Sequence, residues 1–432
     1  MIRRRTPHPN ADSLGPTARS CSKEATMSVI SNTPRQEDDR TGNRGGTGRV
    51  ISLGEVAADI MISVGQLPHP GGFSFADRNY MTVGGSYGTL QAAARLGVES
   101  QHAGVIGNGP WATMIRMAME RDGITHIGQD RLDEDSGFRV IVGDGGTRKT
   151  VIVSYGAEAH GEADAFDMIE PAPGDVVQIS GNTLVNRTAS AVYAFLRRTD
   201  AHWADYGDGL GGSEGDRHHL LADETAALGV KPGGAETDGH MSEAEQSDVE
   251  RPPRRPFHLV FNPMGMSGHL NDSLLETLIL ARPIWSCNKE EARMLAHRLG
   301  VAITEPEPIT VNGSTDAAMP ELCDGLGAVL DAPLIVRTGA TGAWLWEPGD
   351  DGDADGSSLM HIEGYATKAL HTQSAGRCHT GALCAMLARG ANLEDAVELA
   401  NAATSIAVSR ANEGSGAPEC PTMEEAMALV AG

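Results

Sequence analysis

ALHTQSAGRCHTGAL, residues Ala369–Leu383, is the stretch around which the rest of the chain is organised. It begins with small and polar residues and runs into Leu383–Ala388, a sequence that favours helix. A turn of this kind aims several backbone N–H groups, together with the positive end of the helix dipole, at one point. Such a point suits a phosphate or a developing oxyanion. Taken alone, the stretch is more typical of an ordinary helix start, so the rest of the chain has to decide between the two interpretations.

Length and composition favour an α/β protein. The 432 residues give room for a sizeable core and, by length alone, for two or three domains. Aromatic residues make up 4% of the chain and glycine occurs 53 times, a balance more typical of an α/β enzyme than of a β-sandwich. The formal net charge of -24 argues against a nucleic-acid partner, because sequence-independent binding of nucleic acid needs clustered Lys and Arg.

Cysteine usage and hydropathy indicate a cytoplasmic protein. The six cysteines are scattered and form no CxxC pair, so reduced thiols are the simplest account. No apolar run reaches the length of a transmembrane helix, and the basic residues Arg3–Arg5 are followed by polar residues rather than by the apolar core of a signal peptide. We therefore expect a cytoplasmic location and no membrane partner.

Two segments lack the periodic apolar residues of folded structure. Residues 1–48 are polar and rich in Pro, Ser, Thr, Arg and Gly, which predicts a disordered N-terminal tail in which Met27 could be the true start. Residues 203–256 carry a large excess of Asp and Glu and predict an acidic disordered insertion, more typical of a solvated spacer than of a regulatory segment. The rest of residues 49–431 forms the predicted folded domain.

Strands and helices alternate along this domain, which predicts a doubly wound, mostly parallel sheet flanked by helices. The predicted strands are 49–55 with a continuation over 56–62, then 101–106, 175–181, 258–262, 283–288, 334–339 and 343–346. The predicted helices are 90–96, 111–121, 189–198, 273–280, 289–296, 393–407 and 422–430. Residues 303–320 form a looser stretch.

Two further segments predict a small β lid. Within residues 137–155, the runs 137–143 and 150–154 flank Asp144-Gly145-Gly146 and are typical of a β-hairpin. Residues 73–83 follow a turn rich in proline and glycine, and they predict a strand pair or a projecting flap.

Four separated motifs occur in a fixed order along the chain. They are Gly84-Gly85 with Ala92–Gly97, Asn288-Lys289-Glu290-Glu291, Thr338–Ala343, and the opening stretch. Together they resemble the signatures of the ribokinase-like (PfkB) carbohydrate kinase family over essentially all of residues 49–431. The resemblance implies that the protein transfers a phosphoryl group from ATP, with Mg²⁺, to a hydroxyl of a sugar or of a related polyol or nucleoside. It also implies that a homodimer could form through the lid.

The resemblance places the substrate-binding residues near the start of the domain. Asp59 would accept hydrogen bonds from substrate hydroxyls, although an Asp at a strand end also commonly caps a turn. Gly84 and Gly85 would let the backbone approach the substrate closely. The family's substrate-binding Asn should fall at Gly88 or Thr89, and neither is Asn.

The same resemblance places the nucleotide near the second and third motifs. Thr338, Gly339 and Gly342 would line the nucleotide cleft at the carboxyl end of a strand. Asn401 matches a position near the base, and a helix-surface Asn explains it equally well.

Asn288 and Glu291 are the metal candidates. In the family this pair organises Mg²⁺ and its waters, and Mg²⁺ needs few protein ligands because it keeps several waters. The same two residues also fit a helix capping box, in which Asn288 is the N-cap and Glu291 is the third helical residue. Both interpretations can hold together.

The catalytic position departs from the family. The signature Asp-Thr-x-Gly-Ala-Gly-Asp aligns with residues 371–377, so the Ala375-Gly376 core of the anion hole is retained. Its last Asp, which in the family is the base that takes the proton from the attacking hydroxyl, corresponds to Arg377, and a guanidinium cannot accept a proton at physiological pH. His371 or His379 could substitute as a base, although a surface or capping role fits each better.

Two function classes therefore stay open: an active kinase, and a catalytically inactive paralogue that binds a nucleotide or a sugar and acts as a regulatory protein. Two other classes fit poorly. A NAD-dependent dehydrogenase would need Gly-x-Gly-x-x-Gly between the first strand and helix, and a P-loop enzyme would need Gly-x-x-x-x-Gly-Lys-Ser/Thr. The sequence contains neither in the required place.

Overall fold

The structure is a computed structural model, and it describes residues 48–144, 149–200, 255–303, 318–349, 356–370, 372, 375–410 and 420–431. The predicted N-terminal tail, apart from Gly48, and residues 203–254 of the predicted insertion lie outside these ranges, as does His371. No helix within the described ranges has both the length and the apolar character needed to cross a membrane.

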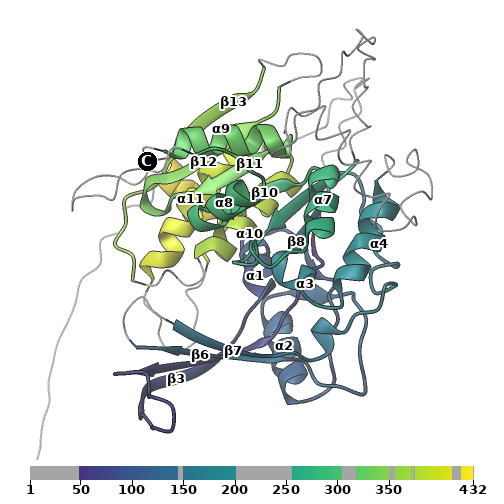
Figure 1. The fold of residues 1–432 in the computed structure, drawn as a ribbon, viewed down its shortest axis with the longest axis vertical. Coiled ribbons are helices and arrows are strands. Elements are labelled where there is room, and N and C mark those ends of the chain that lie inside the picture. The colour runs from purple at the N-terminus through teal and green to yellow at the C-terminus, as the bar shows by residue number, and fades with distance from the viewer. Residues whose placement is uncertain are drawn as a thin grey trace, which may run out of the picture. The chain divides into compact units, whose positions relative to one another are not determined.

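A nine-stranded, mostly parallel sheet forms the centre of the domain, as predicted, with the strand order β13-β12-β11-β10-β9-β8-β1-β4-β5 (Figure 1). The strands from β11 to β5 pair in parallel, whereas β12 and β13 are antiparallel at one edge. The strands are β1 (Val50–Ser52), β4 (Ser100–His102), β5 (Ile124–His126), β8 (Val176–Ser180), β9 (His258–Asn262), β10 (Ile284–Asn288), β11 (Leu334–Arg337), β12 (Gly342–Glu347) and β13 (Ser358–Glu363).

Helices cover both faces of this sheet. Successive strand residues alternate between two buried clusters: Val50 and Val176 pack on one side, and Ile51 and Val177 on the other. The first cluster includes residues of α1 (Tyr87–Arg95), α2 (Pro110–Arg121), α10 (Ala375–Ala388), α11 (Leu393–Ser409) and α12 (Met423–Val430). The second includes residues of α3 (Gly181–Leu184), α4 (Ala189–Thr199), α7 (Asp272–Ala281), α8 (Lys289–Arg298) and α9 (Met319–Leu330).

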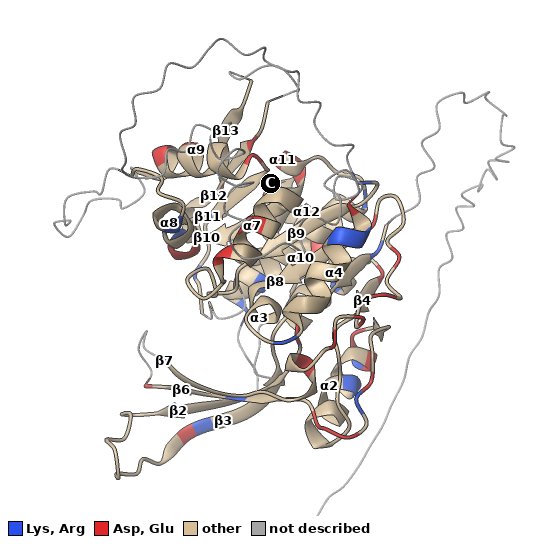
Figure 2. Cartoon of the chain, turned by 45° about the vertical axis from the view of Figure 1, so that its right-hand side comes forward, with Lys and Arg blue, Asp and Glu red and all other residues tan. Residues whose placement is uncertain are grey.

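A separate four-stranded sheet, in the order β3-β2-β6-β7, forms the lid. Its strands are β2 (Ala58–Val64), β3 (Ala76–Val83), β6 (Phe138–Gly143) and β7 (Lys149–Ser154). The predicted hairpin is confirmed as the antiparallel pair β6–β7. Figure 2 shows that these strands carry few charged side chains, and Met81 and Ile152 are exposed on them.

Several predicted elements were wrong. Residues 56–62 do not continue the first strand, because the chain leaves the large sheet after β1 and residues 58–64 pair in the lid instead. Within residues 73–83, Ala76–Val83 form one strand, β3, at an edge of the lid sheet, so the strand-pair alternative was wrong. Helix α9 and strand β13 were missed, and α10 begins at Ala375, well before the predicted helical run. The glycines Gly325 and Gly327 weaken the helical pattern of α9, yet Gly327 has to be small because an added Cβ would lie 2.3 Å from the Trp346 ring.

Candidate functional site

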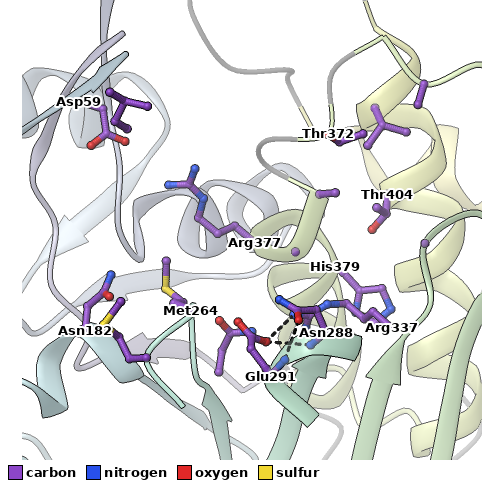
Figure 3. Close-up of a pocket in the computed structure, with 18 of the residues that line it drawn as sticks. Asp59, Asn182, Met264, Asn288, Glu291, Arg337, Thr372, Arg377, His379 and Thr404 are labelled. Carbon is purple, nitrogen blue, oxygen red and sulfur yellow. Dashed lines mark hydrogen bonds and ion pairs between the residues drawn. The ribbon is translucent and has the colours of Figure 1, made fainter. Parts of the chain in front are cut away.

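A cavity of about 810 Å³ lies where the lid faces the large sheet and the beginning of α10. Figure 3 shows part of its lining, in which side chains from both sheets point toward the first turn of α10. Two groups of lining residues can be distinguished. The group near the lid comprises Glu55, Asp59, Arg139, Val153, Tyr155 and Arg377, and the group near β10, β11 and α11 comprises Asn288, Glu291, Arg337, Gly339, His379 and Asn401.

The first turn of α10 opens into this cavity. Ala375 and Gly376 both line it, and N–H groups at a helix start have no partner within the helix. The Ala375 N–H donates to the Thr372 carbonyl at 3.2 Å, which fixes the chain as it enters the helix. Positive helix ends favour anions, so the structure places the predicted anion-hole residues where an anionic group in the cavity would meet them.

Arg377 turns from this helix start toward α1. A Cβ built on Gly88 would lie 3.2 Å from both Cβ and Cδ of Arg377, so a side chain at position 88 would require the arginine to shift by a few tenths of an ångström. Its Nη1 donates to the Gly85 carbonyl at a long 3.5 Å. Gly88, one of the two positions at which the family's Asn was expected, therefore packs against the residue that replaces the base.

Asp59 is held by Arg139, a residue that the sequence interpretation did not single out. Asp59 Oδ1 accepts a hydrogen bond from Arg139 Nε at 2.6 Å, and only 3% and 13% of the two side chains are exposed. Burial opposes the charge of Arg139, but Asp59 and Glu55 outweigh it and raise the pKa of the guanidinium. The carboxylate expected to bind substrate hydroxyls is thus already engaged in a buried ion pair.

Gly84 and Gly85 pack closely against the residues that form this part of the cavity wall. A Cβ on Gly84 would lie 2.1 Å from Asp59 Oδ2 and 2.2 Å from Arg139 Nη2, so only glycine leaves room for the ion pair. Gly85 has a φ of +68°, and a Cβ there would lie 2.3 Å from the Glu55 carbonyl oxygen. The two glycines therefore shape the cavity wall at Asp59 and Arg139 through what they allow to pack against them.

Glu55 is a second buried carboxyl group in the cavity. Its Oε1 lies 3.5 Å from Arg139 Nη1, and its Oε2 has no hydrogen-bond partner among the described residues. Burial raises the pKa of Glu55 to about 7, against the opposing effect of the Arg139 charge. Glu55 therefore holds a proton part of the time near neutral pH.

Asn288 and Glu291 form the predicted capping box at the start of α8. Asn288 Oδ1 accepts from the Glu291 N–H at 2.9 Å, and Glu291 Oε2 accepts from the Asn288 N–H at 2.8 Å. Glu291 Oε1 accepts from the Gly265 N–H at 2.7 Å, and Arg337 Nη2 lies 3.6 Å from Oε2.

These contacts decide how the capping-box residues can meet a metal ion. Within the described ranges, no group of three or more His, Cys, Asp and Glu side chains could hold one. Because both carboxylate oxygens of Glu291 already accept N–H groups, the pair fits an Mg²⁺ ion through the waters that Mg²⁺ retains rather than by direct coordination.

The predicted nucleotide residues lie on the other side of α10. Gly339 and Gly342 line the cavity with positive φ angles of +76° and +105°, and an added Cβ on Gly339 would meet only open space. Thr338 is buried in the same turn, where its Oγ1 donates to the Gly342 carbonyl at 2.9 Å. The turn therefore offers bare backbone to the cavity.

Asn401 and His379 lie next to this turn. Both are buried, so the helix-surface alternative for Asn401 and the surface role expected for His379 were wrong. The Nδ2 of Asn401 donates to the carbonyls of Ile362 and Glu363 at 3.1 Å, which ties α11 to β13. The Asn401 Oδ1 lies 3.2 Å from His379 Nε2. Burial, with Arg337 nearby, lowers the pKa of His379 to about 3, so this imidazole is neutral and a weak base at pH 7. His371, the other candidate base, lies outside the described residues.

The sequence interpretation missed Glu55, Arg139 and Arg337. Glu55 directly follows the first strand, and ligands of parallel sheets bind at the carboxyl ends of strands, so its position was a usable signal. Arg139 and Arg337 each interrupt an apolar strand, which is a weaker signal of the same kind.

Comparisons with known proteins agree with this fold. Residues 266–420 match the model of the pfkB family carbohydrate kinases. The chain is 25% identical over 378 residues to the uncharacterized sugar kinase YegV of Escherichia coli (strain K12), covering 87% of this chain and 92% of that one.

Solved structures of low sequence identity share the architecture. The ribokinase of Thermotoga maritima is 18% identical with a TM-score of 0.57, over 89% of this chain and 100% of that chain. The ribokinase of Cryptococcus neoformans var. grubii serotype A in complex with ADP is 16% identical with a TM-score of 0.58, over 89% and 99%. The large sheet, its helices and the small lid sheet are therefore a ribokinase-like fold.

Proposed function

We propose that this chain, a distant ribokinase-like member of the PfkB family of carbohydrate kinases, transfers the γ-phosphoryl group of ATP to a hydroxyl of a small sugar, polyol or nucleoside. The observation that carries the proposal is the first turn of α10. Ala375 and Gly376 open it into a cavity that reaches both the lid and the carboxyl ends of β10 and β11. A phosphoryl group in transfer needs such an arrangement, because catalysis of this reaction rests on positioning and charge neutralisation.

Each half of the cavity has a proposed task. The nucleotide would lie against Gly339 and Gly342 with Asn401 near its base, as the ADP complex of the Cryptococcus ribokinase makes reasonable for this fold. Mg²⁺, bound with ATP, would neutralise phosphate charge, and Asn288 and Glu291 would orient its waters. The acceptor would lie between Asp59 and the start of α10.

Arg377 limits the rate that this site can reach. With a guanidinium at the base position, the attacking hydroxyl has no carboxylate there to take its proton. General-base catalysis typically contributes about 10²- to 10⁴-fold, so we expect turnover to be slower by that order than in an enzyme with the base. Positioning and electrostatic stabilisation would still operate.

The same residue favours a second candidate, a catalytically inactive relative that binds a nucleotide or a sugar and acts as a regulatory protein. A guanidinium in the cavity strengthens the hold on an anionic ligand through charge-assisted hydrogen bonds. Those bonds add nothing to proton removal. Binding without turnover is the property that separates this candidate from the kinase.

Calorimetry with the full chain tests both candidates. ATP should bind, and Mg²⁺ should change its affinity, if the chain is a kinase or a nucleotide-binding protein; a chain that binds neither ATP nor any sugar contradicts both candidates. Turnover of ATP against a panel of neutral sugars, nucleosides, sugar acids and sugar phosphates then separates them. ADP release that depends on an acceptor supports the kinase, and nucleotide binding without any such release supports the binding protein.

We also propose that the lid is the surface through which two copies associate. Met81 and Ile152 are 58% and 61% exposed on lid strands that carry few charges (Figure 2). Sedimentation should give a dimer that the exchange Ile152→Glu weakens, and a monomer at all concentrations contradicts this proposal.

A further inference from the structure

Arg377 stands out among the cationic side chains that line the cavity. Arg139 is paired with Asp59 at 2.6 Å, and Arg337 donates to Ser286 Oγ at 2.6 Å and lies 3.6 Å from Glu291. Arg377 forms no ion pair with any carboxylate of the described residues, and its long bond to the Gly85 carbonyl uses one of five N–H donors.

A guanidinium in this position is costly without an anion. Burial lowers the pKa of Arg377, with the Arg139 charge acting in the same direction and Asp59 opposing, so the surroundings do not fully compensate its charge. Withdrawing a charge from water costs free energy unless the charge is paired and hydrogen-bonded. An anionic ligand would supply both kinds of contact.

The charge balance of the lid half also favours an anion. Asp59 is neutralised by Arg139, and Glu55 carries only part of a negative charge near pH 7. Glu158, buried near Glu55, is a further carboxyl group, but its oxygens already accept the Gly137 and Gly156 N–H groups. Among the side chains that line this half, the two guanidinium groups therefore outweigh Asp59 and the partly protonated Glu55.

The direction of Arg377 selects the acceptor half over the nucleotide half. Figure 3 shows its guanidinium pointing toward Asp59 and away from Arg337 and His379. Its contacts with Gly85 and Gly88 likewise lie at the start of α1, on the side of the cavity where the acceptor is proposed to lie.

We propose that Arg377 is the anchor of an anion site for the acceptor, so that the acceptor carries a carboxylate or a phosphate in addition to the group that is phosphorylated. The planar guanidinium can bind such a group through two parallel N–H···O bonds, and the positive end of α10 adds to the attraction. The assignment of this site to the acceptor rests on the proposed kinase function. The existence of an anion site rests only on the contacts of Arg377.

Inorganic phosphate is the probe for the site, measured by calorimetry on the full chain at low salt. We expect the wild type to bind phosphate, and Arg377→Gln to lose at least about tenfold in affinity because two charge-assisted bonds disappear. Arg377→Lys should keep the positive charge but lose the paired N–H groups of the guanidinium. Its phosphate affinity should therefore lie between those of the wild type and Arg377→Gln. Arg293→Gln, an exchange on the outer face of α8 where Arg293 pairs with Glu290, removes the same charge and should bind phosphate as the wild type does.

A non-hydrolysable ATP analogue with Mg²⁺ separates the two sources of the anion. If phosphate still binds Arg377 when the analogue is saturating, the site belongs to the acceptor. If the analogue displaces phosphate, or if Arg377→Gln weakens the analogue but not ADP, Arg377 holds the γ-phosphate and the assignment to the acceptor is overturned.

The remaining outcomes also decide the matter. Equal phosphate affinity of wild type and Arg377→Gln, or no phosphate binding by the wild type, overturns the anion site. An analogue that does not bind at all removes the proposed kinase function, while the comparison of phosphate affinities still decides the site. A thermal transition for each variant shows that it is folded.

Discussion

Restoring a carboxylate at the base position is the most direct perturbation of this site. Arg377→Asp places an acceptor of protons on the first turn of α10, one residue after Gly376, where both residues line the cavity. A positioned general base typically contributes about 10²- to 10⁴-fold to a rate. The structure points to the lower end of that range, near about 10²-fold, because the exchange also removes a cation that would offset phosphate charge during transfer.

Water or the substrate must also fill the volume that the arginine leaves beside Gly88. A Cβ at position 88 lies 3.2 Å from Arg377 Cβ and Cδ, so the paired exchange Gly88→Asn with Arg377→Asp refills this volume and returns the amide that the family signature carries. We expect the double variant to exceed Arg377→Asp, mainly through a lower KM for a neutral sugar. Gly88→Asn alone should weaken binding of the acceptor, because the new side chain displaces the arginine from its place.

The assay is ADP release with a panel of neutral sugars and nucleosides, at saturating ATP and Mg²⁺. Arg377→Asn is the matched control, since it removes the cation and opens the same volume without supplying a base. Equal rates for Arg377→Asn and Arg377→Asp would refute the reasoning about the base. Wild-type turnover of about 1–100 s⁻¹, the ordinary range for kinases, would refute the idea that Arg377 impairs catalysis.

Three further exchanges test the part of the cavity wall that is built around Asp59 and Glu55. Asp59→Asn removes the carboxylate closest to Arg139 and leaves Glu55 at 3.5 Å, and since breaking a buried ion pair costs about 3–5 kcal/mol, urea denaturation should show a loss of up to that order; a loss below about 1 kcal/mol would contradict a stabilising role of the Asp59–Arg139 pair. Glu55 has its pKa raised to about 7, so the folded state binds the proton more tightly than the unfolded state, and the free energy of unfolding should fall as pH rises from about 4.5 to about 7. Glu55→Gln should remove that slope, and an unchanged slope would assign it to other groups. Gly84→Ala puts a methyl group 2.1 Å from Asp59 Oδ2 and should lower the melting temperature, whereas Gly143→Ala in the lid meets nothing within 4 Å and should not.

Local sequence patterns were sufficient to predict most of the fold. Short apolar runs predicted β1, β4 and β8 to β12 of the large sheet but not β5 or β13, and the Asn288–Glu291 spacing predicted a capping box that the structure contains. The same patterns could not assign residues 58–64 to the lid, because a buried run does not reveal which sheet it joins. Helix α9 was missed because its glycines lower helical propensity, although they allow close packing, Gly327 against Trp346 and Gly325 against Val301.

The candidate site was predictable only in outline. Gly84, Gly85, Asp59 and the start of α10 could be named from their motifs, and the structure gathers them around one cavity or its wall. Their partners could not be named, since Arg377 contacts Gly85 across 292 residues of sequence. A sequence pattern gives residue types at a spacing, and it does not say which side chains compete for the same volume.

The contact between Gly88 and Arg377 also couples the two positions in evolution. A Cβ at position 88 would lie 3.2 Å from the arginine side chain, so the effect of an exchange at one position depends on the residue at the other. A side chain at position 88 and the arginine can coexist only if one of them shifts by a few tenths of an ångström. Glycine at position 88 makes that shift unnecessary, and it therefore widens the set of sequences in which an arginine at position 377 is tolerated.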